Sequence, residues 1–267
     1  MFASAIVSQP GATGEDRGGP EFENAAKKNS VLMNSLKWNW GKTQTGWYLY
    51  VPLLKKTLST GADPESAEFA GAVARWQIDQ GEAATGILDR KTLFLLIGHW
   101  QSQRIDPIYE AKPTSLLSAP IAEFYDRARA RSLLKVDREA YNAYREMLAE
   151  ARKDLFPREN EQPDSENLYL KIISSYRSPA YQAELRKKEP GATRAQIAFR
   201  SPHFTGRALD IYVGGEPVST KDSNRAVQIR SAAYLWLVEN AERFGFYPYF
   251  YEPWHWEFTG KRLMTEN

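Results

Sequence analysis

Apolar residues recur at helical spacing within the first hundred positions of the chain. Phe69, Val73 and Trp76 fall on one face of a helix. Asp63 and Pro64 stand ahead of them as the expected N-cap and first-turn residues. The pattern predicts a short amphipathic helix that packs through this face.

A second helix is predicted after a glycine-rich break at residues 81–86. Asp89 is placed to cap it, and Leu93 and Leu96 lie on its apolar side. With the aromatic segment ahead of them, these helices predict a compact helical unit that ends near Gln103.

The second half of the chain mixes helical and strand-like patterns. Residues 121–153 are rich in helical periodicity, and Asp137 is the expected cap of a helix there. The strand-like runs cover residues 169–174, 208–213 and 249–258, with a helical segment at 224–244. Helices grouped ahead of and between a few strands predict an α+β fold.

The length of 267 residues favours two domains, each with its own small core. Three prolines without sustained periodicity mark residues 105–120 as a linker. Residues 1–30 lack the basic start and apolar stretch of a secretory signal, so no export signal is visible. The expected parts are a flexible leader at 1–30, a three-helix domain at 31–104, the linker at 105–120 and the α+β domain at 121–267.

Composition narrows the classes of partner. The formal net charge of +2 offers no dense cationic surface for a phosphate backbone, so no nucleic-acid partner is expected. No apolar run approaches the ~20 residues that cross a bilayer, so no membrane span is expected. The chain has no cysteine, so any bound metal must be held by histidine or carboxylate side chains.

Two of the three histidines stand in patterned segments near the C-terminus. His203, Asp210 and His255 would supply the three protein ligands of a zinc site that keeps a fourth position open. Gly206 would let the chain turn after His203, and alternation along the next strand would point Asp210 toward the site. His99 ends an apolar helix without a partner motif, so we interpret it as structural.

Around the second histidine, Pro253 interrupts an aromatic run and would shift its register. Glu252 and His255 could then face one cavity despite their odd separation. The aromatic side chains expected to close this site off from water are Trp254, Trp256 and Phe258.

The segment Ala72-Val-Ala-Arg-Trp-Gln, with Thr85-Gly86 and then Asp89 and Thr92-Leu93, resembles the repeat of the peptidoglycan-binding three-helix domain. Trp76 stands where that family usually has Phe. The resemblance implies a module that binds bacterial cell wall. The alternative is a helical packing domain with no ligand of its own.

The segment Ser201-Pro-His-Phe-Thr-Gly-Arg-Ala-Leu-Asp210, followed by Glu252-Pro-Trp-His255, resembles the signature of the LAS peptidases, which include the VanY-type D-alanyl-D-alanine carboxypeptidases. That signature reads Ser-x-His-x-x-Gly-x-Ala-x-Asp and then Glu-x-x-His. Ser174-Ser-Tyr-Arg-Ser resembles the Gly-Tyr-Arg-Ser segment of the same family, with Ser175 in place of Gly. The resemblance spans about Val136 to Gly260 and implies a small antiparallel sheet with flanking helices.

The resemblance also implies roles for individual residues. Glu252 would take a proton from the zinc-activated water and return it to the leaving amine. Arg177 would neutralise the developing oxyanion or hold the substrate carboxylate. Gln182 and Ser201 are expected to contact the substrate or support the ligands. The implied zinc ligands are His203, Asp210 and His255.

The implied activity is zinc-dependent hydrolysis of peptidoglycan stem peptides by a D-alanyl-D-alanine carboxypeptidase, in the periplasm or at the cell wall outside the cell. One alternative is an endopeptidase that cuts L-alanyl-D-glutamate inside the stem peptide. Another is a zinc-containing wall-binding module without catalysis, although the presence of Glu252 argues against it. A lysostaphin-like enzyme would show His-x-His where this chain has His255-Trp-Glu257. The oligomeric state does not follow from these patterns.

Overall fold

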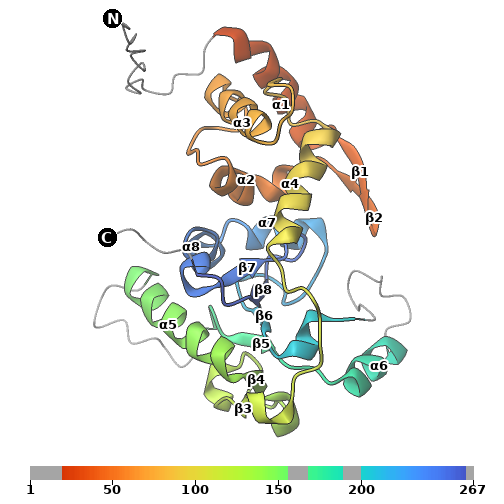
Figure 1. The fold of residues 1–267 in the computed structure, drawn as a ribbon, viewed down its shortest axis with the longest axis vertical. Helices are drawn as coiled ribbons and strands as arrows, with labels where there is room; N and C mark the ends of the chain where they lie inside the picture. The colour runs from red at the N-terminus through yellow and green to blue at the C-terminus, as the bar shows by residue number, and fades with distance from the viewer. Residues whose placement is uncertain (1–19, 156–167, 189–199, 263–267) are drawn as a thin grey trace, which may run out of the picture.

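The computed structural model describes residues 20–155, 168–188 and 200–262. An N-terminal helical unit lies above a C-terminal unit built around a small sheet (Figure 1). The predicted α+β class is confirmed. Within the described ranges, no helix has the length and apolar character needed to span a bilayer.

The N-terminal unit contains more elements than the three helices expected. In chain order it comprises η1 (Pro20–Phe22), α1 (Glu23–Ser35), β1 (Lys37–Trp40), β2 (Lys42–Thr45), η2 (Tyr48–Tyr50), α2 (Val51–Thr57), α3 (Ala67–Asp79) and α4 (Arg90–Ser102). Residues 23–30, expected within a flexible leader, are helical here because buried Asn29 joins α1 to the loop before α4. Its side chain donates to the Gly86 carbonyl and accepts from the Leu88 N–H, both at 2.8 Å. Residues 1–19 lie outside the described part.

The caps of α3 and α4 show one wrong prediction and one confirmed prediction. Ser66, rather than Asp63, caps α3, because its Oγ accepts from the Phe69 N–H at 3.1 Å. Asp63 instead closes the preceding turn by accepting from the Glu65 N–H. Asp89 caps α4 as predicted, accepting from the backbone of the first turn at 2.9 Å.

The segment from Ala72 to Leu93 forms part of the packing of this unit. The buried Gln77 amide donates to the hydroxyl oxygens of Thr85 and Thr92, and its oxygen accepts from the Gly86 N–H at 2.9 Å. Gly86 has φ +66°, and a Cβ there would lie 2.8 Å from the Ala70 carbonyl oxygen. These motif residues therefore hold α3 and the loop before α4 together.

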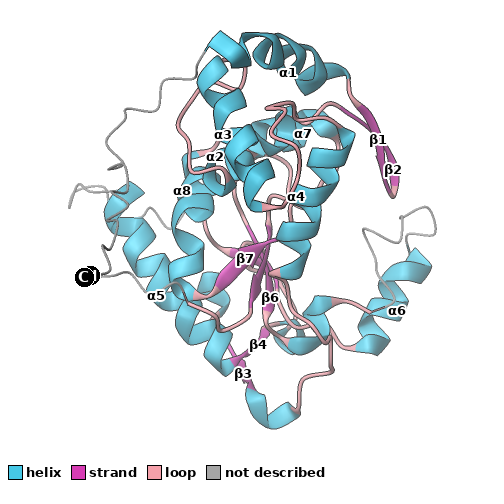
Figure 2. Cartoon of the chain, turned by 45° about the horizontal axis from the view of Figure 1, so that its top comes forward, coloured by secondary structure: helices cyan, strands magenta, loops and turns pink. Residues whose placement is uncertain are grey.

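The C-terminal unit is an antiparallel sheet of four strands with helices around it (Figure 2). Its strand order is β5-β6-β8-β7. In chain order the unit comprises η3 (Pro113–Ser115), β3 (Leu116–Ser118), η4 (Ile121–Glu123), η5 (Arg131–Leu133), β4 (Lys135–Asp137), α5 (Arg138–Leu155), β5 (Ile172–Ser174), α6 (Pro179–Lys188), η6 (Pro202–Thr205), β6 (Ala208–Ile211), α7 (Asp222–Gln228), α8 (Ala232–Asn240), η7 (Ala241–Phe244), β7 (Phe246–Pro248) and β8 (His255–Phe258). Asp137 caps α5 as predicted, accepting from two backbone N–H groups of its first turn.

Three expected segments have different bounds. The helical run 224–244 is divided between α7, α8 and η7, because Ser231 begins a new helix by accepting from the Tyr234 N–H. The run 249–258 is a turn followed by the short strand β8. The last residues of the expected linker form β3, which pairs with β4. The C-terminal unit therefore begins before residue 120.

The two faces of the sheet have different neighbours. Trp256 of β8 lies edge to face with Tyr234 of α8, with ring centroids 6.3 Å apart, so α8 covers this face. Successive strand residues point to opposite faces, which places His255 and Glu257 on the other one. Trp256 and Phe258 therefore lie across the sheet from His255, and the prediction that they line its site is wrong.

The two units share one continuous cluster of buried apolar side chains instead of the two separate cores expected. Phe250, in the turn before β8, joins them. Its ring lies 5.0 Å from that of Trp40, 5.4 Å from that of Tyr50 and 5.9 Å from that of Trp100, measured between centroids. The N-terminal unit is thus packed on the C-terminal unit next to the segment that carries Glu252.

Candidate metal centre

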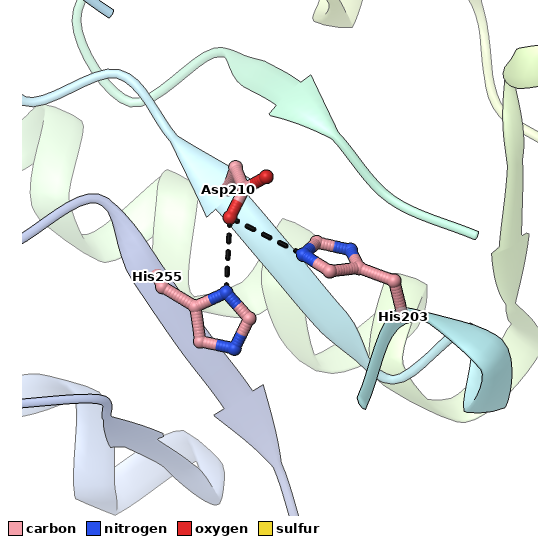
Figure 3. A group of neighbouring side chains, drawn as sticks. All are labelled: His203, Asp210 and His255. Atoms are coloured by element: carbon pink, nitrogen blue, oxygen red, sulfur yellow. Dashed lines mark hydrogen bonds and ion pairs between the residues drawn. The ribbon is translucent and has the colours of Figure 1, made fainter. Parts of the chain in front are cut away.

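Asp210 and His255 meet because their strands pair. They are direct register partners in β6 and β8, so their side chains rise from the same face of the sheet. Asp210 Oδ1 lies 3.0 Å from His255 Nδ1 (Figure 3). The sequence-based expectation that alternation points Asp210 toward the site agrees with this geometry.

His203 reaches the same carboxylate from the 3-10 turn η6. Ser201 caps this turn by accepting from the His203 N–H at 3.4 Å, and Gly206 ends it with φ +69°. His203 Nε2 then lies 3.3 Å from Asp210 Oδ1 (Figure 3). A short segment that turns at a glycine thus delivers two side chains to one point.

A backbone carbonyl fixes the ring of His203. Its Nδ1 lies 2.7 Å from the carbonyl oxygen of Ser175, so Nδ1 carries the proton and donates it there. The Nε2 lone pair is left facing Asp210. Ser175 is itself fully buried and held by its hydroxyl, which donates to the Lys135 carbonyl at 2.7 Å.

Glu257 fixes the ring of His255. Its Oε1 lies 3.0 Å from His255 Nε2, so Nε2–H donates to the carboxylate and Nδ1 faces Asp210. Glu257 was not expected to act at this site. The signal that would have found it is the spacing of two in a strand, which places both residues on one face.

The three side chains fit a zinc ion. One ligand atom from each of His203, Asp210 and His255 lies within 4.8 Å of the others. Zinc bonds of about 2.0–2.2 Å in a tetrahedron separate ligand atoms by roughly 3.3 Å, close to the two distances above. Two imidazoles and a carboxylate are also a donor set of catalytic zinc sites. In the described part of the chain, His99 belongs to no such group.

The electrostatics of the centre favour a cation. Burial alone would lower the pKa of His255, but hydrogen bonds and charge from Asp210 and Glu257 outweigh it and raise this pKa to about 9. Burial and the charge of Arg177 lower the pKa of His203 to about 4. The metal-free chain therefore holds one proton between His255 and Asp210, where the two ligand atoms face each other.

Asp210 is ionised in this setting. Burial would raise the pKa of its carboxyl, but the neighbouring histidines and the Arg177 guanidinium hold it well below its usual range. A buried anion that accepts from several donors is suited to bind a dication.

Glu252 lies in the turn ahead of β8 and not in a strand. Its N–H donates to the Tyr249 carbonyl at 3.0 Å, and its carbonyl accepts from the His255 N–H at 2.9 Å. Burial raises the pKa of its carboxyl to about 7. A carboxylate with this pKa can accept and return a proton near neutral pH.

Two guanidinium groups border the centre. Arg177 donates from Nη2 to Asp210 Oδ2 at 2.5 Å and from Nε to Ser174 Oγ at 2.9 Å. Arg129 donates from Nη2 to the same hydroxyl at 3.4 Å and from Nη1 to the Ile173 carbonyl at 2.8 Å. Arg129 was not expected at this site, because nothing in its turn segment signals that it lies beside β5.

The two remaining candidate residues have different places. Ser201 is buried and caps the turn that carries His203, so it supports the position of that side chain. Gln182 is the buried residue of α6. Neither belongs to the group of three converging side chains.

A family model matches the C-terminal part of the chain. Residues 133–261 match the family model of VanY, D-alanyl-D-alanine carboxypeptidase. A solved structure of the LD-carboxypeptidase LdcB, described as revealing the basis of peptidoglycan recognition, is 26% identical, with a TM-score of 0.41. That match covers 57% of this chain and 71% of the LdcB chain. A search of curated proteins finds no match.

Proposed function

We propose, from the premise that residues 133–261 belong to the VanY family of D-alanyl-D-alanine carboxypeptidases, that the chain hydrolyses peptide bonds in the stem peptides of peptidoglycan with the help of zinc. The preferred substrate is a stem peptide that ends in D-alanyl-D-alanine. Such a substrate places the protein in the periplasm or at the wall outside the cell.

One observation carries the proposal. His203 Nε2, Asp210 Oδ1 and His255 Nδ1 converge in one place, and the buried carboxyl of Glu252 lies in the turn that leads into His255. The three proposed ligands thus come from separate segments to a common centre, and Glu252 belongs to the segment that carries His255. A binding module without catalysis would have no need for a buried carboxyl with a pKa near neutrality.

The residues of the centre have separate roles in the reaction. A zinc ion held by His203, Asp210 and His255 would supply a Lewis acid and make water a nucleophile at neutral pH. Glu252 takes a proton from the water as the water oxygen attacks the scissile carbonyl carbon. It returns that proton to the amide nitrogen as the C–N bond breaks.

Positive charge on one side of the centre supports terminal cleavage. Arg177 and Arg129 both donate to Ser174 Oγ, so two guanidinium groups lie close to the proposed ligands. A free C-terminal carboxylate is the substrate group that guanidinium forks bind well. We therefore prefer the carboxypeptidase over an enzyme that cuts within the stem peptide.

Mass spectrometry of purified muropeptides tests the function. The zinc-loaded protein is expected to remove one terminal D-Ala from pentapeptides, and a sample treated with EDTA is expected to leave them intact. An internal cut, such as at L-alanyl-D-glutamate, would show that the protein is an endopeptidase and not a carboxypeptidase. Intact pentapeptides in both samples would contradict the proposed activity.

Wall binding by residues 31–104 is part of the same proposal and is supported by the motif from Ala72 to Leu93. Sedimentation of the EDTA-treated full chain with insoluble wall tests it, with soluble stem peptide added to compete for the C-terminal unit. Retention that persists with the soluble peptide supports a second wall-binding surface. Retention that disappears would show that all binding is through the C-terminal unit.

A further inference from the structure

The N-terminal unit reaches the metal centre at the end of α4. This helix runs from the N-terminal unit toward the sheet, and its C-terminal end lies near β7 in both views (Figures 1 and 2). Arg104 follows the C-cap residue of this helix, Gln103, and its Nη1 donates to Gln101 Oε1 of α4 at 2.9 Å. Arg104 is thus anchored to the N-terminal unit while its guanidinium faces the C-terminal unit.

Arg104 and its neighbour hold Glu257 at both oxygens. Arg104 Nε donates to Glu257 Oε1 at 2.9 Å, and Nη2 donates to the same oxygen. The Ile105 N–H donates to Oε2 at 2.8 Å. The Glu257 side chain has no exposed surface, so it depends on such partners to remain an acceptor.

The same carboxylate orients His255. Glu257 Oε1 lies 3.0 Å from His255 Nε2, on the side of the ring opposite to the nitrogen that faces Asp210. A ligand histidine held through its other nitrogen presents its lone pair to the metal in a fixed direction. The contacts therefore run from Arg104 through Glu257 to His255.

A second contact between the units supports the same ring. Trp40, at the end of β1, donates from its indole N–H to the Tyr249 hydroxyl at 2.9 Å. The Tyr249 ring stands edge to face with His255 at 5.9 Å between centroids, and the Arg104 guanidinium lies 4.1 Å from its centre. Glu257 and Tyr249, which both contact His255, are thus held by the N-terminal unit.

We propose that the N-terminal unit completes the metal centre, with Arg104 as a positioning residue that acts through Glu257 on His255. This inference rests on the metal centre of the proposed function and gives the N-terminal unit a role apart from wall binding. Arg104 is not among the three side chains that converge on the centre. Its effect is to fix which nitrogen of His255 faces Asp210 and in which direction.

Zinc affinity, measured in the full chain by competition with a chelator, tests this role. Arg104→Ala is expected to weaken zinc binding by about 10–100-fold, the usual effect of losing a group that orients a metal ligand. Arg104→Lys is expected to recover part of the loss, because an ammonium can pair with Glu257 but cannot donate from a fork. The free energy of unfolding of each metal-free variant shows whether the fold is retained.

Lys56→Ala is the matched control. Lys56 also joins the two units, donating to the Glu239 carbonyl at 2.9 Å, but it does so at the surface and away from the centre. Its loss is expected to leave zinc affinity within about twofold of wild type. An equal weakening in both alanine variants would show that packing of the units alone is responsible and would overturn the proposal, as would wild-type affinity in Arg104→Ala.

The tautomer of His255 is a second readout, which a change in packing alone would not alter. In NMR spectra of the zinc-loaded wild type, the His255 proton is expected on Nε2 and slow to exchange, whereas Arg104→Ala is expected to exchange it faster. Equal exchange in both would contradict the proposal. Neither zinc affinity nor proton exchange requires cleavage. If the protein cleaves no peptide but both readouts change as expected in Arg104→Ala, the proposed peptidase activity is wrong and the positioning role of Arg104 still holds.

Discussion

The Gly206 carbonyl accepts a hydrogen bond from the Asp137 N–H at 3.0 Å, which joins the turn after His203 to the start of α5. Gly206 has φ +69°, and a Cβ there would lie 2.7 Å from Leu116 Cδ2. The turn that carries a proposed ligand is thus pressed against the β3-β4 hairpin, and only glycine fits.

Gly206→Ala is expected to lower the free energy of unfolding by about 2 kcal/mol or more, because left-handed strain and overpacking add. Zinc affinity should fall as well, since His203 moves with the turn. Chemical denaturation and chelator competition measure the two effects. Gly61→Ala is the control, because nothing lies within 4 Å of its added Cβ; similar losses in both variants would contradict this account.

Ser175→Ala separates the hydroxyl of Ser175 from its carbonyl. Loss of the hydrogen bond to Lys135 is expected to cost about 1 kcal/mol of stability. Zinc affinity should not change, because the carbonyl that holds His203 remains. Ser35→Ala, which removes an exposed hydroxyl bond to Val31, is the control and should cost less than about 0.5 kcal/mol. Weaker zinc binding in Ser175→Ala would show that the hydroxyl matters to the centre.

Much of the centre could be predicted from sequence because its parts are local. The segment from Ser201 to Asp210 contains a cap, a turn glycine and a strand, and each dictates the direction of the next residue. The caps Asp89 and Asp137 were predictable for the same reason.

The rest depended on contacts between distant segments. Arg104 and Glu257 are 153 positions apart and meet only because the two units share a core. The side of the sheet to which Trp256 points depends on where α8 packs, which aromatic composition does not reveal. Ser66 displaced Asp63 as a cap because both are good capping residues and the local turn decided between them.

Glu252→Ala is expected to lower turnover by about 10²–10⁴-fold, because the proton carrier is lost. Zinc should remain bound, since Glu252 is not among the three converging ligand atoms. Steady-state cleavage of pentapeptide and metal analysis measure the two effects. Glu239→Ala, which removes an exposed carboxylate, should cleave at the wild-type rate. Full turnover in Glu252→Ala would refute the assigned role.

In the metal-free chain, the raised pKa of Glu252 should make the free energy of unfolding depend on pH. Burial raises this pKa from 4.5 to about 7, so the folded chain keeps a proton that the unfolded chain releases earlier as pH rises. Glu252 therefore costs stability increasingly between those pH values. Glu252→Gln lacks this cost, and its stability relative to wild type should rise by roughly 2–3 kcal/mol between pH 5 and 8. Denaturation in EDTA at both pH values checks this, and a constant difference would contradict it.

A zinc titration of chelator-stripped protein, with pentapeptide cleavage as the readout, tests whether this chain is a zinc peptidase. We expect no cleavage without zinc, a linear rise as zinc is added and saturation at one zinc per chain. Asp210→Asn, which removes the shared anion, should need far more zinc for the same rate. Full cleavage by the stripped protein, or an unchanged titration in Asp210→Asn, would contradict a zinc peptidase centred on His203, Asp210 and His255.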